Sequence, residues 1–279
     1  MPPDDGSRAA IGWRARLELA FERRGARSVL AHRRHEGPLV VQKPLYPEGE
    51  GACHAIVVHP PAGIAGGDDI ALFVEVAEAS HALITTPGAG KWYRSSGAWA
   101  RQRSDMRVSD RGCLEWLPQE TILYDASRAE ISWHADLAGE ARLIAWDIFC
   151  LGRTASGESY ERGEARIETR VRRGGRLAWV ERARLDTGMQ RSAAGLAGEP
   201  VFGTMLASAP AIEPAWIAAC REEQPASGEC AITTVPSVLI ARYRGDSTEA
   251  ARRYFAALWR RLREPLLGRA PCEPRIWRT

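Results

Sequence analysis

The sequence lacks the patterns typical of membrane proteins, of secreted proteins with disulfides and of zinc-binding proteins. No apolar run reaches the length needed to span a bilayer. The six cysteines form no CxxC pair and show no zinc-ligand spacing. Because no secretory signal pattern opens the chain, the cysteines predict reduced thiols and a cytoplasmic protein without disulfides.

The chain also lacks complete nucleotide-binding motifs. Gly90-Lys91 imitates the end of a phosphate loop, but that motif requires a glycine five residues before Gly90 and Ser or Thr after the lysine. Those positions hold Thr85 and Trp92. The glycines of segment 59–68 also miss the dinucleotide spacing GxGxxG. The sequence therefore argues against nucleotide binding.

Two further function classes lose support from what is missing. No GxSxG motif is present, so the sequence does not predict a serine hydrolase of the α/β type. The net charge is only +3 and charges of both signs are mixed along the chain. A nucleic-acid-binding protein would carry a concentrated basic face, so nucleic acid is not an expected partner.

What the sequence does contain is a long series of short β-strand patterns. After a polar tail at residues 1–12, alternating apolar and polar residues recur over residues 13–186, separated by turn-forming residues. Gly174-Gly175 is a typical two-residue hairpin turn. These patterns predict an all-β body, and the pattern alone does not choose between a sandwich and a β-helix.

The pattern changes over residues 187–279, where we expect a mixed region packed on the β body. A short helix is predicted to begin at Pro214. A returning strand is expected over 231–243 and an amphipathic helix over 248–264, capped by Ser247 and ended by Pro265. An extended C-terminal tail follows.

The segment from His59 to Gly97 holds two glycine-rich turns joined by strand-like residues. Its second turn gathers two cations, Lys91 and Arg94, around Trp92 and Tyr93. Aromatic residues and arginine are enriched at protein interfaces. The simpler interpretation is a tight turn in which the cations are solvated and the aromatic side chains pack.

Cys53-His54 is a candidate metal-binding pair. Histidine and cysteine are good ligands for borderline and soft metal ions, so these neighbours could form a site. The alternative is that the two side chains alternate across a strand, one pointing inward and one outward.

Three carboxylates are candidates for chemistry. Asp147 lies within an apolar run, where an unpaired charge is costly, and is the strongest of the three. Glu158 lies in a glycine-containing loop and Glu181 follows an apolar strand pattern. Asp147 and Glu181 could serve a β-helical carbohydrate-active hydrolase with paired carboxylates. Alternatively, Glu158 and Glu181 form surface ion pairs, and Asp147 forms a buried ion pair with Arg153 or Lys91.

A set of distinctive motifs is spread over nearly the whole chain. They are Gly37-Pro38-Leu39, Gln42-Lys43-Pro44, Cys53-His54, HPPAGIAGGD from His59, the run from Lys91 to Ser96, LEWLPQETI from Leu114, Asp147, Leu151-Gly152-Arg153, Gly157-Glu158 and Pro274-Arg275-Ile276-Trp277. Together these motifs resemble the urease accessory protein UreD (UreH) family. Two departures are slight: Ala62 stands where the family often has glycine, and Trp92 adjoins Tyr93 where another aromatic residue is common.

The resemblance implies a right-handed β-helix-like body with added helices towards the C-terminus. It implies no catalytic activity, no catalytic residues and no tightly bound cofactor, only transient Ni²⁺. Proteins of this family are scaffolds that bind apo-urease and UreF, reach the GTPase UreG through UreF, and connect indirectly with the nickel carrier UreE. The complex inserts nickel into urease, and a polar passage through the UreD-like protein is a proposed nickel route.

From the resemblance we expect two sets of site residues. The expected nickel route uses weak oxygen ligands, with Cys53 and His54 as weaker candidates. The C-terminal helix and tail are expected to contact UreF. A nickel-storing protein with Cys53 and His54 as ligands remains a further hypothesis. The route residues are Asp147, Glu181, Glu158, Thr85 and Thr86, and the partner-binding residues are Lys91, Tyr93, Arg94, Arg260, Arg263, Arg275 and Trp277.

Overall fold

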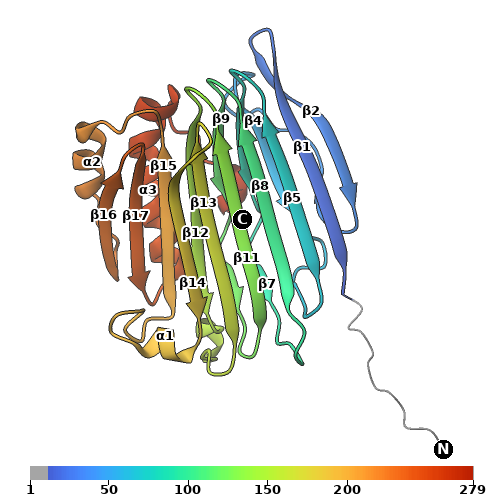
Figure 1. The fold of residues 1–279 in the computed structure, drawn as a ribbon, viewed down its shortest axis with the longest axis vertical. Helices are drawn as coiled ribbons and strands as arrows, with labels where there is room; N and C mark the ends of the chain where they lie inside the picture. Colours follow the sequence, from blue (N-terminus) through green and yellow to red (C-terminus); the bar gives the residue numbers. More distant parts are fainter. Residues whose placement is uncertain (1–11, 279) are drawn as a thin grey trace, which may run out of the picture.

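The computed structural model describes residues 12–278 as two facing β-sheets with helices beside the second sheet (Figure 1). The expected polar tail, apart from Gly12, lies outside the described residues. The first sheet has seven strands in the order β14-β13-β11-β8-β5-β1-β2. The second has the order β16-β17-β15-β12-β9-β6-β4-β3, with β10 and β7 beside it.

The central strands form a β-solenoid of about four turns, because the chain alternates between the two sheets. Neighbouring strands within each sheet are parallel there. This confirms the predicted β-helix-like body. The strands of the first sheet are β1 (Arg14–Arg24), β5 (Asp69–Val76), β8 (Ala100–Val108), β11 (Arg128–Leu137) and β13 (Glu164–Arg173), and those of the second are β4 (Cys53–Val58), β6 (His81–Thr85), β9 (Cys113–Leu117) and β12 (Arg142–Leu151).

Antiparallel strands complete both sheets. In the first sheet, β2 pairs with β1 at one edge and β14 pairs with β13 at the other. The β13–β14 turn is the predicted Gly174-Gly175 hairpin, and both glycines have positive φ. The remaining strands are β2 (Arg27–Glu36), β3 (Val40–Val41), β7 (Gly90–Trp92), β10 (Thr121–Leu123), β14 (Arg176–Leu185), β15 (Val201–Ser208), β16 (Glu229–Val235) and β17 (Val238–Gly245).

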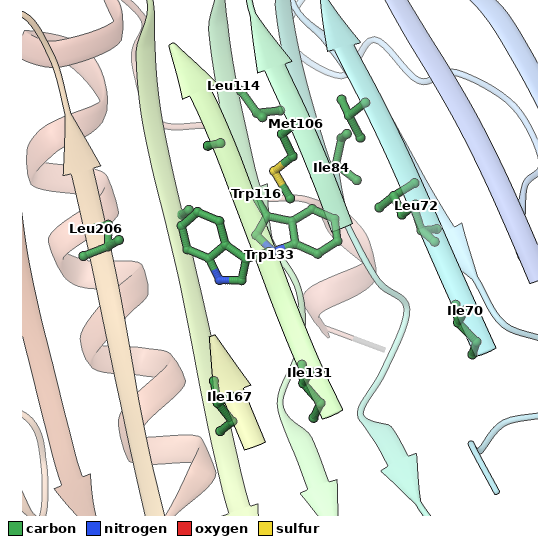
Figure 2. Packing of buried hydrophobic residues seen from close by; sticks show 14 of the residues in the cluster. Ile70, Leu72, Ile84, Met106, Leu114, Trp116, Ile131, Trp133, Ile167 and Leu206 are labelled. Atoms are coloured by element: carbon green, nitrogen blue, oxygen red, sulfur yellow. The ribbon is translucent and has the colours of Figure 1, made fainter. Parts of the chain in front are cut away.

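The main core lies between the two sheets, where every second residue of each strand points inward. The pattern is clearest in β11, whose Ile131, Trp133 and Ala135 are buried while His134 and Asp136 face the outside. Figure 2 shows Trp133 from the first sheet and Trp116 from the second among the side chains that fill this space. The alternation read from the sequence is therefore the alternation that builds the core.

A second core lies on the outer face of the second sheet, under α3 (Thr248–Leu267). The Ser247 hydroxyl accepts a hydrogen bond from the amide of Ala250, as a helix cap does. The prediction that Pro265 ends this helix was wrong. A proline removes only one hydrogen bond so near the C-terminus, and the helix runs on to Gly268, whose φ of 71° closes it.

The predicted single strand over 231–243 was also wrong, because β16 and β17 form a hairpin. Pro236 cannot donate to a ladder, and Ser237 turns the chain with a φ of 63°. The helix predicted at Pro214 is present as α2 (Pro214–Arg221). Among residues 12–278, no helix is both long and apolar enough to cross a membrane. The remaining elements are α1 (Thr187–Arg191) and the 3-10 turns η1 (Thr154–Ser156) and η2 (Arg275–Arg278).

Candidate functional site

Four loops gather at one end of the solenoid, where second-sheet strands finish and first-sheet strands begin. We call this the loop end; it lies at the lower side of Figure 1, where β1 starts. Backbone hydrogen bonds tie each loop to the next, including Tyr93 to Ile64, Tyr124 to Trp92 and Gly152 to Leu123. Five of the ten motifs that carry the family resemblance therefore lie wholly or partly in these connected loops. The loops comprise residues 59–68, 86–99, 118–127 and 152–163.

The glycine-rich motif of the first loop serves close packing of the chain. A Cβ atom built on Gly63 would lie 2.2 Å from Cε2 of Tyr93, so the bare backbone makes room for that ring. The Tyr93 ring also packs edge-on against Tyr124, with centroids 5.3 Å apart. Trp92 is buried, so the tight-turn interpretation of this segment holds for its aromatic residues.

Ala62 occupies a backbone conformation that glycine adopts more readily than alanine. Its φ is 63°, in the left-handed region, which costs an L-residue about 1–2 kcal/mol. Glycine loses about 0.5–1 kcal/mol more backbone entropy on folding than alanine. We therefore expect Ala62→Gly to raise the free energy of unfolding by up to about 1 kcal/mol, measured by urea denaturation.

The matched control is Ala71→Gly in the extended strand β5, where no strain is relieved. That change is expected to lower the free energy of unfolding by about 0.5–1 kcal/mol. Ala62→Val is expected to destabilise the chain, because β-branched residues disfavour positive φ. Equal losses from Ala62→Gly and Ala71→Gly would contradict the strain at Ala62.

A cavity of about 420 Å³ lies at the loop end, between the two sheets. Loops 59–68, 86–99 and 118–127 contribute to its lining, and so do inward-facing residues of the strands. Its only carboxylate among the described residues is Asp147, and its only ammonium group belongs to Lys91. Further polar lining groups are His59, Thr86, Gln102, Ser104, Gln119 and Thr121.

Asp147 lies on β12, is partly buried and lines the cavity. The indole Nε1 of Trp133, from the opposite sheet, donates a hydrogen bond to its Oδ2. Burial raises the pKa of Asp147 to about 7; the Trp133 hydrogen bond opposes this rise and the negative charge of Glu181 adds to it. The carboxyl group is thus close to half-protonated at neutral pH.

The structure does not show the ion pair considered as the alternative for Asp147. Arg153 instead pairs with Glu158, and the described residues include no acidic partner for Lys91. The Asp147 carboxyl receives a hydrogen bond from a neutral indole but has no cationic partner. Burial therefore raises its pKa, because nothing nearby compensates the negative charge fully.

The structure brings only part of the predicted nickel route together. Thr86 lines the cavity with Asp147, and Glu181 is near enough to Asp147 to influence its pKa. Thr85 points to the opposite face of the second sheet, where its hydroxyl donates to the Leu117 carbonyl.

Glu158 does not line the cavity either; it binds Arg153 and accepts from the amide of Asp125. Glu181 pairs with Arg242 at 2.5 Å. The ion pairs considered for Glu158 and Glu181 are therefore the observed arrangement.

Cys53 and His54 point to opposite faces of β4. Cys53 belongs to the core between the sheets, whereas the His54 Nε2 lies 2.6 Å from Glu48 Oε1, on the side of α3. This is the alternation across a strand, so the two side chains do not converge on one metal ion. Among residues 12–278, no three His, Cys, Asp or Glu side chains are grouped so that they could hold a metal.

A buried charge network lies under α3, and the sequence analysis missed it. Arg263 is fully buried and donates from Nε to Glu115 Oε2 at 3.1 Å and from Nη2 to Glu48 Oε1 at 2.5 Å. His81 lies 2.7 Å from Glu115, and Trp259 donates to the same carboxylate at 2.5 Å. Burial raises the pKa of Glu115, but His81 and Arg263 outweigh burial and lower it to about 2.

The predicted partner-binding residues fall into two groups. Tyr93 and Arg94 are exposed at the loop end beside Lys91, which lines the cavity. Arg260 and Arg275 are exposed on the C-terminal side.

Arg263 and Trp277 were wrongly assigned to a partner surface. Arg263 is held in the charge network, and the indole of Trp277 packs on Trp146 and Trp259 and donates to Thr85 Oγ1 at 2.9 Å. Both side chains stabilise the chain itself, because they are buried by its own residues.

Comparison with known proteins decides the family. The model of the UreD urease accessory protein family matches residues 14–278. The chain belongs to the UreD family. It is 52% identical over 273 residues to the urease accessory protein UreD of Azoarcus sp. (strain BH72), covering 97% of this chain and 96% of the relative. It is 51% identical over 273 residues to UreD of Dechloromonas aromatica (strain RCB), covering 96% and 95%.

A third relative, UreD of Nitrosococcus oceani, is 44% identical over 280 residues, covering 100% of this chain and 94% of the relative. The resemblance drawn from the motifs is thus confirmed. These relatives are named as accessory proteins, which fits the expectation of a protein that is not an enzyme and gives no support to the hydrolase hypothesis.

One residue that the sequence analysis of this UreD-family chain missed could have been identified from its sequence context. Glu115 stands between Leu114 and Trp116 in a buried strand, which is the same conflict of charge and burial that singled out Asp147. Its partner Arg263 was predicted to be a partner-binding residue. His59 was named only as the first residue of a glycine-rich motif, although it lines the cavity.

Proposed function

We propose that this UreD-family protein acts in urease maturation as a scaffold without catalytic activity, and that Ni²⁺ passes through the cavity between its sheets. The observation that carries the proposal is the Asp147 carboxyl facing a cavity that opens among the motif-bearing loops. The family and its accessory-protein relatives supply the link to urease. Nickel is cargo in this proposal.

The cavity has the chemistry of a transit site. Its lining offers one carboxyl with a pKa of about 7, together with hydroxyl and amide oxygens, which are weak ligands for Ni²⁺. Lys91 offsets the charge of Asp147, so the lining carries little net negative charge to retain a divalent ion. Weak ligands without strong retention favour passage over storage, which is the reason to prefer transit to the nickel-storing hypothesis.

The proposed partners are apo-urease, UreF, the GTPase UreG through UreF, and the carrier UreE indirectly, assembled in the cytoplasm. Tyr93, Arg94 and Lys91 at the loop end suit one partner surface, because exposed aromatic and cationic side chains are frequent interface anchors. We expect the C-terminal region to contact UreF through exposed side chains such as Arg260 and Arg275, because a partner can reach only exposed residues.

The passage is tested with Asp147→Leu in cells that co-express urease and its accessory proteins. Asp147 supplies the only cavity carboxylate within residues 12–278, and its loss is expected to lower the nickel content of purified urease at least about tenfold. This is the size of loss typical for residues that support metal ligands. Nickel is measured by elemental analysis, and complex assembly by co-purification.

Glu158→Gln is the matched control, since that carboxylate lies in a loop but does not line the cavity. It is expected to leave the nickel content of urease unchanged. Unchanged nickel in urease matured with an assembled Asp147→Leu complex would refute the passage.

A further inference from the structure

Strand β14 is an edge strand whose outward side makes no hydrogen bonds. The two sheets have four edge strands, β2, β14, β3 and β16. Other residues bind the backbone of three of them: the Ser28 amide of β2 donates to the Glu50 carbonyl, and arginine side chains donate to the carbonyls of β3 and β16. Within residues 12–278, the backbone of β14 is bound only by its neighbour β13. Its outward amides and carbonyls are therefore open to another strand.

The second sheet extends past β14 and leaves room for such a strand. Glu181 of β14 pairs with Arg242 of β17, so the first sheet ends opposite β17. Figure 1 shows β17 and β16 continuing beyond β14 at the left. Cys230 and Ile232 of β16 pack towards the helices, so the exposed Ala231 between them lies on the inner face of that sheet. A strand added to β14 would lie over this inner face.

The strand also exposes apolar side chains. Among the described residues, four large apolar side chains are exposed, and two of them are on β14: Leu177 at 55% and Val180 at 40%. The other two, Trp13 and Tyr93, lie at the loop end. Exposed apolar side chains on an open edge strand favour the addition of a further strand.

Arginine side chains decide which kind of strand fits this edge. Three arginines lie on β14, Arg176, Arg182 and Arg184, whereas its single acidic residue, Glu181, faces inward. Arg176 and Arg172, close to the hairpin turn, have no acidic partner in the described part of the chain. A second copy of β14 would bring arginine beside arginine, which is unfavourable. An acidic strand would instead form cross-strand pairs of opposite charge.

We propose that β14 is the docking edge for an extended segment of a partner protein in which acidic residues alternate with apolar ones. The segment adds to the first sheet as a further strand through backbone hydrogen bonds. Its acidic side chains lie on the outer face beside Arg182 and Arg184, and its apolar side chains lie on the inner face over β16. The edge is separate from the cavity, so the inference does not depend on the nickel passage.

The test uses the full-length chain and a synthetic peptide of the length of β14, in which glutamate alternates with valine. The peptide is expected to bind and to slow amide hydrogen exchange within residues 176–185, read by mass spectrometry. The same peptide with proline in place of each valine keeps the charge but cannot form a strand ladder, so it is expected not to bind. A peptide with lysine in place of glutamate is also expected not to bind.

Arg176→Glu is expected to weaken binding of the glutamate peptide about three- to tenfold, because it replaces a cross-strand attraction by a repulsion. The affinity is measured by fluorescence anisotropy at low ionic strength. The substitution breaks no ion pair within the described residues. Arg14→Glu is the matched control, since Arg14 is another exposed arginine of the first sheet without an acidic partner there, and it lies on β1. It is expected to leave the affinity unchanged.

Four results would overturn the proposal. The first is no protection of residues 176–185, and the second is equal binding of the proline peptide, which would leave ionic attraction alone. The third is tighter binding of a short DNA duplex than of the peptide, lost in Arg176→Glu, which would assign the edge to nucleic acid. The fourth is a dimer of the wild-type chain in sedimentation that Val180→Lys dissociates, which would assign the edge to a second copy.

Discussion

Arg263→Met is expected to lower the free energy of unfolding by about 3–5 kcal/mol, because it leaves buried carboxylates without their counter-charge. Arg263 is fully buried and reaches both Glu115 and Glu48. Methionine fills a similar volume, so most of the loss comes from the uncompensated charge rather than from a void. Urea denaturation at neutral pH measures the change.

The matched control is Arg261→Met, on the same helix two residues away. Arg261 pairs with Glu223 on the exposed side of α3, and such surface pairs contribute little to stability because solvent screens them. A loss of less than about 1 kcal/mol in both variants would mean that the charge network does not hold α3 to the second sheet.

Asp147→Asn is expected to raise the free energy of unfolding by about 4 kcal/mol at pH 8 and by about 2 kcal/mol at pH 5. The folded-state pKa of Asp147 is about 7, against an ordinary value of 3.8. The folded chain therefore binds more protons than the unfolded chain between about pH 4 and pH 7, so stability falls as pH rises through that window. Asparagine does not titrate and can still accept from Trp133.

Asp136→Asn on the exposed face of β11 is the control, and its stability difference from wild type is expected to stay the same from pH 5 to pH 8. Over this range the carboxylates of the network under α3 remain ionised, since the pKa of Glu115 is about 2. A pH-independent gain from Asp147→Asn would contradict the raised pKa. The stabilised variant is also expected to deliver less nickel, because the carboxylate is gone.

The fold was predictable to the extent that it depends on local alternation and turn residues. Strand patterns such as that of β11 and the Gly174-Gly175 hairpin correspond directly to observed elements. Pattern alone did not separate a sandwich from a solenoid, because that choice depends on which distant strands pair. Pro236-Ser237 shows the same limit on a smaller scale, since a two-residue hairpin there looks like one strand in sequence.

A site residue was predictable where a charged residue stands among apolar sequence neighbours. It was not predictable where its role depends on residues that are distant in sequence. Asp147 was identified by its apolar run, and it does face the cavity. The role of Arg263 depends on Glu115, 148 positions away, so the sequence predicted a partner-binding residue instead of a buried ion pair. Thr85 and Thr86 are adjacent in sequence, yet only Thr86 reaches the cavity, because strand geometry sends neighbours to opposite faces.

The reversed strands β2 and β14 also bear on self-association. A stack of parallel coils could in principle continue from one molecule into the next and grow into fibres. Here both edge strands of the first sheet, β2 and β14, are antiparallel to their neighbours. Strand β2 also carries a row of exposed arginine and histidine side chains. Charged side chains on an edge strand disfavour edge-to-edge pairing, so we expect this edge to resist polymerisation.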